Sequence, residues 1–330
     1  MKISVLVLTY NQEKYIRQAL DSIITQELDC NFEIVIGEDA STDQTARIVN
    51  EYQNRHPNRI RVLLSDRAAA ERDRKRGLGG KNNFIRTLKA CRGEYVAMLD
   101  GDDYWTDSHK LKKQVEFLDS HPDFVICFHN VSSFYEDGSQ APENLPSNNV
   151  REVSAIEDLL KGNFIPACSA MFRSGLVTEF PDWFLTLKIG DWPFYILEAQ
   201  HGKIGYLNEV MAAYRVHRAA HWSHKGRSHQ DITFLKMLKF IDKHFDGKYK
   251  NIIDGTRARY YFELAELYCA IGRPQRALIP IKLGLRSSRF RHRGLLSLLL
   301  QVKVPSLYNA LRGFRNLVTT RESDSPSLTP

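Results

Sequence analysis

Short apolar runs that alternate with helical patterns dominate the first 130 residues. Ile3–Leu8 is almost continuously apolar, as expected for a parallel strand that is covered on both faces. Apolar residues then recur on one face of Glu13–Thr25, which predicts a helix. The same alternation predicts strands at Phe32–Ile36, Ile60–Leu64 and Tyr95–Leu99, and helices at Asp43–Tyr52 and Asn83–Ala90. We therefore expect an α/β fold with a doubly wound, mixed but mainly parallel sheet.

The rest of the chain divides into segments of different character. Residues 67–80 are charged and end in glycines, so we expect a mobile loop there. Strand-like runs at 124–134, 167–172 and 210–216 continue the α/β domain, and the pattern becomes helical from about residue 229. Tyr260–Ala270 and Gln275–Leu285 flank a short turn and predict a helical hairpin. We expect an α/β domain over 1–225, a basic helical extension over 226–318 and a disordered tail over 319–330.

Polar residues follow three of the predicted strands. They are Thr9-Tyr10-Asn11, Glu38-Asp39 and Asp100-Gly101-Asp102-Asp103. In doubly wound sheets the ligand lies beyond the carboxyl ends of the strands, so these groups should face one crevice. Carboxylates there suit Mg²⁺ or Mn²⁺, which can bridge diphosphate oxygens. The alternative is an ordinary turn, because Asp and Gly are common in turns, but the convergence of strand ends favours a nucleotide–metal site.

Two familiar nucleotide motifs do not match. Gly77-Leu78-Gly79-Gly80-Lys81-Asn82 has Asn where a P-loop needs Ser or Thr, and no dinucleotide fingerprint follows the first strand. We expect Lys81 to contact the phosphates of the nucleotide donor that binds at this site; a solvated loop is the alternative. A nucleotidyltransferase would carry a basic, glycine-rich loop after the first strand. Thr9–Glu13 stands there instead, which disfavours that class.

Several blocks together resemble the family 2 glycosyltransferases, which have the GT-A fold. The blocks are Ser4–Asn11, Gly37–Asp43, Tyr95–Trp105, Lys110–Gln114, Gly190–Trp192 and Tyr214–His217. They occur in the family's order and span roughly residues 1–225. The resemblance implies an inverting transfer of a sugar from a nucleoside-diphosphate donor to a hydroxyl of a glycan or lipid-linked acceptor. The expected nucleoside diphosphate is UDP.

The resemblance also implies roles for individual residues. Asp39 would accept hydrogen bonds from the uracil ring, Asp102 and His217 would bind Mg²⁺ or Mn²⁺, and Asp191 would be the general base. Further donor-binding residues would be Thr9, Tyr10, Asn11, Glu13, Asp100 and Gly101. On local grounds Asp191 could instead be only the cap of the helix that follows it. An inactive scaffold is a further alternative, against which the retained acidic set argues.

The net charge of +7 is concentrated near the C-terminus, where residues 248–318 carry 14 Lys and Arg against 3 Asp and Glu. Leucines at 295–300 lie among these cations, which indicates peripheral contact with an anionic membrane; a helix packed on the domain is the alternative. No nucleic-acid recognition motif accompanies the charge. The five cysteines lack a CxxC pair, and we see no export signal or apolar run of 18 residues, so we expect a cytoplasmic protein, peripheral on the inner face of the membrane.

Overall fold

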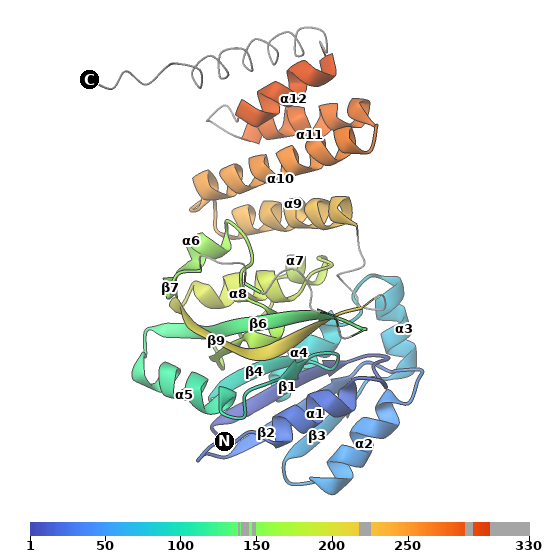
Figure 1. The fold of residues 1–330 in the computed structure, drawn as a ribbon, viewed down its shortest axis with the longest axis vertical. Helices are drawn as coiled ribbons and strands as arrows, with labels where there is room; N and C mark the ends of the chain where they lie inside the picture. The colour runs from blue at the N-terminus through green and yellow to red at the C-terminus, as the bar shows by residue number, and fades with distance from the viewer. Residues whose placement is uncertain (138, 140–144, 147–149, 218–225, 288–292, 304–330) are drawn as a thin grey trace, which may run out of the picture. The chain divides into compact units, whose positions relative to one another are not determined.

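The computed structural model describes residues 1–137, 139, 145–146, 150–217, 226–287 and 293–303 (Figure 1). The chain divides into two compact units, Met1–His224 and Lys225–Pro330, and each has its own hydrophobic core. The tail predicted over 319–330 lies outside the described residues.

The described part of the first unit contains one nine-stranded sheet. Its strands are β1 (Ile3–Thr9), β2 (Phe32–Glu38), β3 (Ile60–Leu64), β4 (Tyr95–Asp100), β5 (Tyr104–Trp105), β6 (Phe124–Tyr135), β7 (Val153–Ser154), β8 (Met171–Arg173) and β9 (Lys203–Val216). Their order is β3-β2-β1-β4-β8-β6-β9-β5, with β7 paired to β9. β1 to β4 are mutually parallel, β8 is antiparallel to both neighbours, and the long strands β6 and β9 run parallel side by side (Figure 1). This confirms the predicted α/β fold with a mixed, mainly parallel sheet.

Helices cover both faces of this sheet. They are α1 (Ile16–Ile24), α2 (Thr45–Arg55), α3 (Arg67–Lys75), α4 (Lys81–Ala90), α5 (Lys110–Ser120), α6 (Ile156–Leu159), α7 (Asp182–Leu185) and α8 (Asp191–Ala199), with a 3₁₀ turn at Ala167–Ser169. Alternate residues of β1, such as Val5 and Val7, join the core formed with α1, α2 and α5. On the other face α4 packs closely on β2: a Cβ added at Gly37 would lie 2.1 Å from Thr87 Oγ1.

The segment that follows β3 corrects one prediction. Residues 67–75 form helix α3 instead of a mobile loop. The carboxylate of Asp66 accepts a hydrogen bond from the Ala69 N–H at 2.8 Å and caps the helix, and the alanines that follow are strong helix formers. The charged residues that suggested a loop are largely on the helix's exposed side, while Ala70 is buried.

Strand β5 pairs with the end of β9 and so joins it to the segment that follows β4 in the chain. Tyr104 pairs with Ala213 and Trp105 with Ala212, in antiparallel register. Because β5 begins directly after the acidic turn at 100–103, the residues at the end of β9 lie beside that turn. This long-range pairing sets up the site described below.

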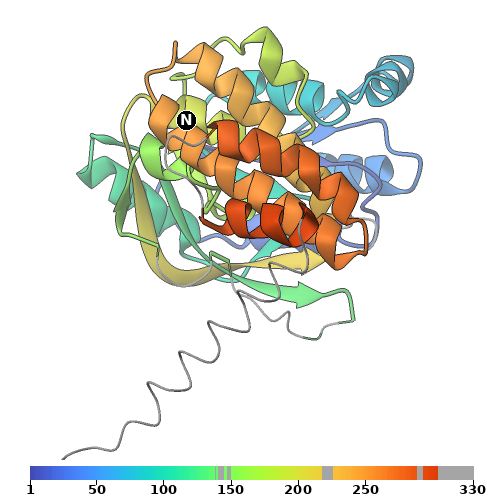
Figure 2. The ribbon, with the colours of Figure 1, turned by 90° about the horizontal axis from the view of Figure 1, so that it is seen from above.

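The second unit is helical in its described residues. It contains α9 (Arg227–His244), α10 (Lys250–Ala270), α11 (Pro274–Ser287) and α12 (Arg293–Lys303), which lie alongside one another (Figure 2). Its small core is formed by Ala265, Ala277, Ile281, Leu295 and Leu298. The predicted helical hairpin is confirmed as α10 and α11, although α10 begins at Lys250, earlier than expected. None of the described helices is both long enough and apolar enough to span a bilayer.

Candidate active site

The carboxyl ends of β1, β2 and β4 lie side by side. Thr9 pairs with Glu38, and Leu8 pairs with Asp100. Beyond the strands, the N–H of Asp39 donates to the Thr9 carbonyl at 3.1 Å and the N–H of Gly101 donates to the Leu8 carbonyl at 2.8 Å. The three polar strand ends expected from the sequence therefore meet at one edge of the sheet.

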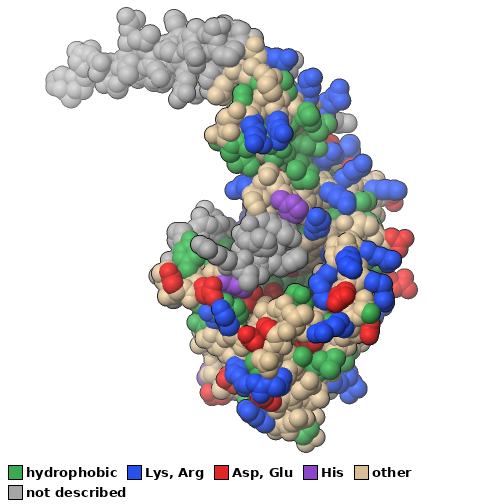
Figure 3. Space-filling view, turned by 90° about the vertical axis from the view of Figure 1, so that its right-hand side faces the viewer, with side chains coloured by type: hydrophobic (Ala, Val, Ile, Leu, Met, Phe, Trp, Pro, Cys, Tyr) green, Lys and Arg blue, Asp and Glu red, His purple; other side chains and the backbone are tan. Residues whose placement is uncertain are grey.

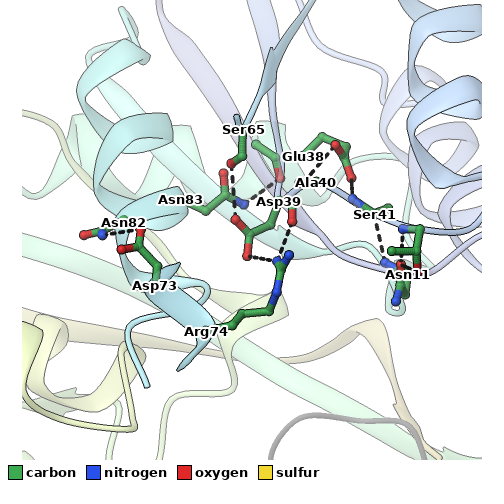
Figure 4. A network of polar contacts seen from close by, with 12 residues as sticks. Asn11, Glu38, Asp39, Ala40, Ser41, Ser65, Asp73, Arg74, Asn82 and Asn83 are labelled. Carbon is green, nitrogen blue, oxygen red and sulfur yellow. Dashed lines mark hydrogen bonds and ion pairs between the residues drawn. The ribbon is translucent and has the colours of Figure 1, made fainter. Parts of the chain in front are cut away.

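Asp39 lies in a polar network with a residue that the sequence did not single out, Arg74 (Figure 4). The Arg74 Nη1 donates to the Asp39 carbonyl at 2.8 Å and lies 3.4 Å from the Asp39 carboxylate, while Ser65 donates to that carboxylate at 3.2 Å. The Arg74 guanidinium also lies 4.5 Å from the centre of the Tyr10 ring. Burial raises the pKa of Asp39, and Ser65, Arg74 and the N–H of Gly80 lower it in part.

Two other predicted donor-binding side chains stabilise the neighbouring loop. The Asn11 Oδ1 accepts a hydrogen bond from the Thr42 N–H at 2.7 Å (Figure 4), and the Glu13 carboxylate accepts one from the Gln44 N–H at 2.8 Å. Asn11 also has a φ of 52°, a conformation that Asn tolerates better than most residues. With its side chain engaged, Asn11 would contact a donor through its backbone. Contact between Glu13 and a donor stays a prediction.

The acidic turn after β4 contains carboxylates in different environments. Burial, with help from the charges of Asp102 and Asp191, raises the pKa of Asp100 to about 7. Asp103 is 2% exposed and accepts a hydrogen bond from the Arg215 N–H at 2.9 Å, and burial raises its pKa well above the ordinary value. Asp103 therefore connects the turn to β9, whereas Asp100 faces the other acidic groups of the site.

Asp102 pairs with His217 across the turn. The His217 Nε2 lies 2.9 Å from Asp102 Oδ2, and the Arg215 Nε donates to the Asp102 carbonyl at 2.9 Å. The His217 ring is buried and lies 5.1 Å from the Tyr15 ring, and its Nδ1 has no hydrogen-bond partner within the part of the chain that the structure describes. Asp102 is thus held by His217 at its carboxylate and by Arg215 at its carbonyl.

This pair fits the first ligands of a divalent cation. A carboxylate oxygen and an imidazole nitrogen are donors that Mn²⁺ accepts, and the carboxylate also suits Mg²⁺. Among the described residues no group of three or more His, Cys, Asp or Glu could enclose a metal ion. Such a cation would therefore take its remaining ligands from water and substrate phosphates, as Mg²⁺ usually does.

Asp191 is the first residue of α8, and Gly190 is the N-cap. The Asn163 Nδ2 donates to Asp191 Oδ2 at 3.3 Å. Burial raises the pKa of Asp191, while the N–H groups of Trp192 and of Asp191 itself, the charge of Lys81 and the Asn163 amide lower it in part. Because the charge of Asp191 also raises the pKa of Asp100, the two carboxylates share one electrostatic environment.

Lys81 does not lie where the sequence suggested. Its side chain is buried, and its Nζ donates to the carbonyls of Phe184 and Ile189, each at 2.7 Å. The solvated-loop alternative is wrong, and the prediction that Lys81 meets the donor's phosphates does not agree with this geometry. Lys81 begins α4 and faces the segment that leads to Asp191.

The sequence did not reveal Arg74 or Asn163. The loop predicted for 67–80 concealed the role of Arg74. The cap at Asp66 and the three alanines at 68–70 were the signal that could have placed Arg74 on a helix. Asn163 lies in an irregular segment and reaches Asp191 across 28 positions of the chain, so no local pattern points to it.

The fold and the site together define a class of protein. It is an α/β protein with carboxylates at the ends of parallel strands and a histidine beside them that follows a strand distant in the sequence. The profile of the family described as "Glycosyl transferase family 2" matches residues 4–179, more than half of the chain. The chain belongs to this family, which confirms the resemblance found in the sequence.

Relatives and solved structures agree with this assignment. The chain is 40% identical over 219 residues to an uncharacterized protein of Mycobacterium tuberculosis, covering 66% of this chain and 60% of that protein. It is 30% identical over 249 residues to poly(ribitol-phosphate) beta-N-acetylglucosaminyltransferase TarS of Staphylococcus aureus, covering 73% of this chain and 40% of TarS. The chain thus spans less than two thirds of the length of either relative.

Solved structures share the fold at low identity. A crystal structure of S. aureus TarS in complex with UDP-GlcNAc aligns with a TM-score of 0.66 at 18% identity, over 96% of this chain and 92% of that one. The mannosyltransferase PcManGT of Pyrobaculum calidifontis, in complex with GDP-Man and Mn²⁺, aligns with a TM-score of 0.53 at 17% identity, over 92% and 88%. Both confirm the GT-A fold.

Substitution of Gly101 should disturb the acidic turn. A Cβ there would lie 2.6 Å from Gln12 Oε1 and 2.9 Å from both Ile16 Cδ1 and Thr9 Oγ1. We expect Gly101→Ala to lower the free energy of unfolding by about 1–3 kcal/mol, the usual cost of overpacking, as measured by urea denaturation. Gly255→Ala is the control, since its added Cβ meets nothing within 4 Å. Unchanged stability of Gly101→Ala would contradict the close approach of α1 to the turn.

Proposed function

We propose that this chain transfers a sugar, with inversion, from a UDP-linked donor to a hydroxyl of a glycan or lipid-linked acceptor, with Mg²⁺ or Mn²⁺ bound. The observation that carries the proposal is the gathering of Asp39, the Asp102–His217 pair and Asp191 around the carboxyl ends of the parallel strands of one sheet. Family membership and the nucleotide-sugars named for two proteins of the same fold support it.

The nucleoside would bind at Asp39 and Tyr10. A carboxylate accepts hydrogen bonds only, so an ionised Asp39 favours a base that presents an N–H, as uracil does. Tyr10 is 39% exposed and offers an aromatic face to such a base. Arg74 contacts both residues, so one guanidinium links the carboxylate and the aromatic ring that would face the base.

The diphosphate would lie near the turn at 100–103. Asp102 and His217 would bind the cation, which offsets the negative charge that develops on the departing nucleoside diphosphate. The Arg215 side chain donates from its Nε to the Asp102 carbonyl, which holds Asp102 without using its carboxylate. Thr9, whose Oγ1 is buried without a hydrogen-bond partner among the described residues, and Gly101 lie at the same edge of the sheet.

Asp191 would accept the proton of the acceptor hydroxyl. The hydroxyl oxygen forms the new bond to the anomeric carbon while the bond to the diphosphate breaks on the opposite side, so the configuration inverts. A raised pKa makes the carboxylate of Asp191 a stronger base than an ordinary aspartate. Asn163 holds this carboxylate from the side.

Asp191→Asn tests the role of the base. We expect kcat to fall by about 10²–10⁴-fold with little change in donor KM, since general bases contribute on that scale. In the unsubstituted protein, kcat should fall as the pH drops through the raised pKa of Asp191, because the protonated carboxyl cannot accept a proton. The measurement is nucleotide release from a panel of nucleotide-sugars with and without Mn²⁺. No metal-dependent turnover with any donor would overturn the proposed function and favour an inactive scaffold.

Substitutions at Asp102 and Asp103 form a matched test of the proposed metal site. Asp102→Ala should abolish the Mn²⁺-dependent part of UDP binding, measured by calorimetry, while the melting temperature stays close to that of the unsubstituted protein. Asp103→Ala should chiefly destabilise the fold, because it removes the buried carboxylate that accepts the Arg215 N–H. Equal Mn²⁺-dependent affinity in Asp102→Ala would remove Asp102 from the metal site.

The second unit supports peripheral contact with an anionic membrane. α11 has no acidic residue, and Ile279 (68% exposed) and Leu283 (38% exposed) lie one turn apart on its solvent side, flanked by the exposed cations Lys282 and Arg286. Figure 3 shows Lys and Arg side chains next to apolar ones on this unit. Apolar area bordered by cations suits the surface of an anionic bilayer. We infer a location on the cytoplasmic face of a membrane.

Neutralising the cations of α11 tests this contact. Each cation near an anionic surface contributes about 1 kcal/mol, so Lys282→Gln with Arg286→Gln should weaken binding to phosphatidylglycerol-containing vesicles about thirtyfold in co-sedimentation. Lys239→Gln with Lys243→Gln, two exposed cations spaced alike on α9, is the matched control and should change little. Equal losses in both pairs would mean that the overall charge attracts the protein, and no loss in either would contradict the contact.

A further inference from the structure

Lys81 connects α4 to the segment that precedes α8. It is the first residue of α4 and lies three residues before Phe84, so both side chains project from one side of the helix. Phe84 packs against Phe194 of α8 with ring centres 5.1 Å apart. On the same side, the Lys81 Nζ donates to the carbonyls of Phe184 and Ile189, each at 2.7 Å, and lies 4.7 Å from the centre of the Phe184 ring.

Helix stability does not account for a lysine at this position. A cation at a helix N-terminus is unfavourable because the helix dipole is positive there, and the first turn of α4 contains no acidic residue to offset it. Burial of the ammonium adds a further cost. The two carbonyls and the aromatic ring compensate for these costs, so the position of Lys81 depends on the segment that it contacts.

That segment leads directly to the proposed base. Phe184 lies in α7 and Ile189 is two residues before Asp191, so the ammonium binds both ends of the connection between α7 and α8. From the other side, Asn163 donates to Asp191, and the Asn163 Oδ1 accepts the Ile165 N–H at 3.1 Å, which fixes the orientation of the amide. Asp191 is therefore held between two independent anchors.

Lys81 also acts on Asp191 through its charge. The titratable groups that face Asp191 are Lys81 from α4, Asp100 at the end of β4 and Tyr195 within α8. Of these three, only Lys81 is a cation, and it lowers the pKa of Asp191 against the effect of burial. It thus favours the ionised carboxylate, the form that can accept a proton.

The residues on either side of Lys81 contact the nucleoside end of the site. The N–H of Gly80 donates to Asp39, and Gly80 has a φ of 81° that only glycine adopts easily. The Asn82 Nδ2 donates to Asp73 of α3 at 2.7 Å (Figure 4). Three consecutive residues therefore join Asp39, α3 and the segment before Asp191.

We propose that Lys81 is a positioning residue: it holds the segment before Asp191 and so sets where Asp191 lies relative to the donor site. The proposal rests on the proposed function, in which Asp191 is the base. It assigns Lys81 no contact with the donor.

The test compares kcat, donor KM and the pH profile of kcat in Lys81→Met, Lys81→Arg and Lys89→Met. Lys81→Met should lower kcat about ten- to a hundredfold, the scale of a small misplacement, with donor KM unchanged. Its acidic limb should move to higher pH, because loss of the cation lets the pKa of Asp191 rise. Lys81→Arg keeps the charge, so its acidic limb should stay in place while kcat falls less. Lys89→Met, an exposed lysine of the same helix, should resemble the unsubstituted protein.

Each result decides the proposal. A raised donor KM in Lys81→Met, with kcat and the acidic limb unchanged, would overturn it and return Lys81 to the donor phosphates. If Lys81→Met does not fold, Lys81→Arg alone decides, and an unchanged kcat there overturns the proposal. Asp191→Asn, run in parallel, separates the two levels: activity retained in that variant refutes the base, whereas loss in Asp191→Asn with normal Lys81 variants refutes only the positioning role.

Discussion

The parallel pairing of β1 with β2 and β4 is the constraint on which the site depends. Parallel strands end at one edge of a sheet, so Thr9, Asp39 and Asp100 meet without any loop having to carry them there. The same arrangement places buried carboxylates close together, where each disfavours the ionisation of the next. The pKa of Asp100 is raised to about 7, which reflects this unfavourable ionisation. A bound cation and the positive groups near these carboxylates would relieve this effect.

A second constraint comes from the other half of the chain. The acidic turn keeps its shape because β5 pairs with β9 and because Asp103 accepts the Arg215 N–H. One carboxylate of the turn is thereby used for structure, which leaves Asp102 free to face His217. The proposed metal site thus depends on a pairing between residues more than a hundred positions apart, and a turn with the same sequence in isolation would not form it.

These two constraints explain what the sequence could and could not predict. The strands β1 to β4 and the carboxylates at their ends followed from local patterns, since strand period and strand-end position are properties of neighbouring residues. The antiparallel β8, the return of β9 and the contact of Asn163 with Asp191 depend on distant partners, and no local pattern encodes them. Helix α3 was missed for a different reason: its charges outweighed its cap at Asp66 in the prediction.

The environment of Asp191 reconciles two demands on the base that we propose it to be. Burial alone would make the carboxylate strongly basic but protonated, and full hydration would leave it ionised but weakly basic. At the start of α8 the backbone N–H groups and the Lys81 ammonium oppose the effect of burial, so the pKa of Asp191 rises less than burial alone would raise it. Since Lys81 fixes Ile189 and influences the charge of Asp191 with one ammonium, the position and the basicity of Asp191 depend on the same contact. A change at the start of α4 would therefore alter both the position and the pKa of Asp191.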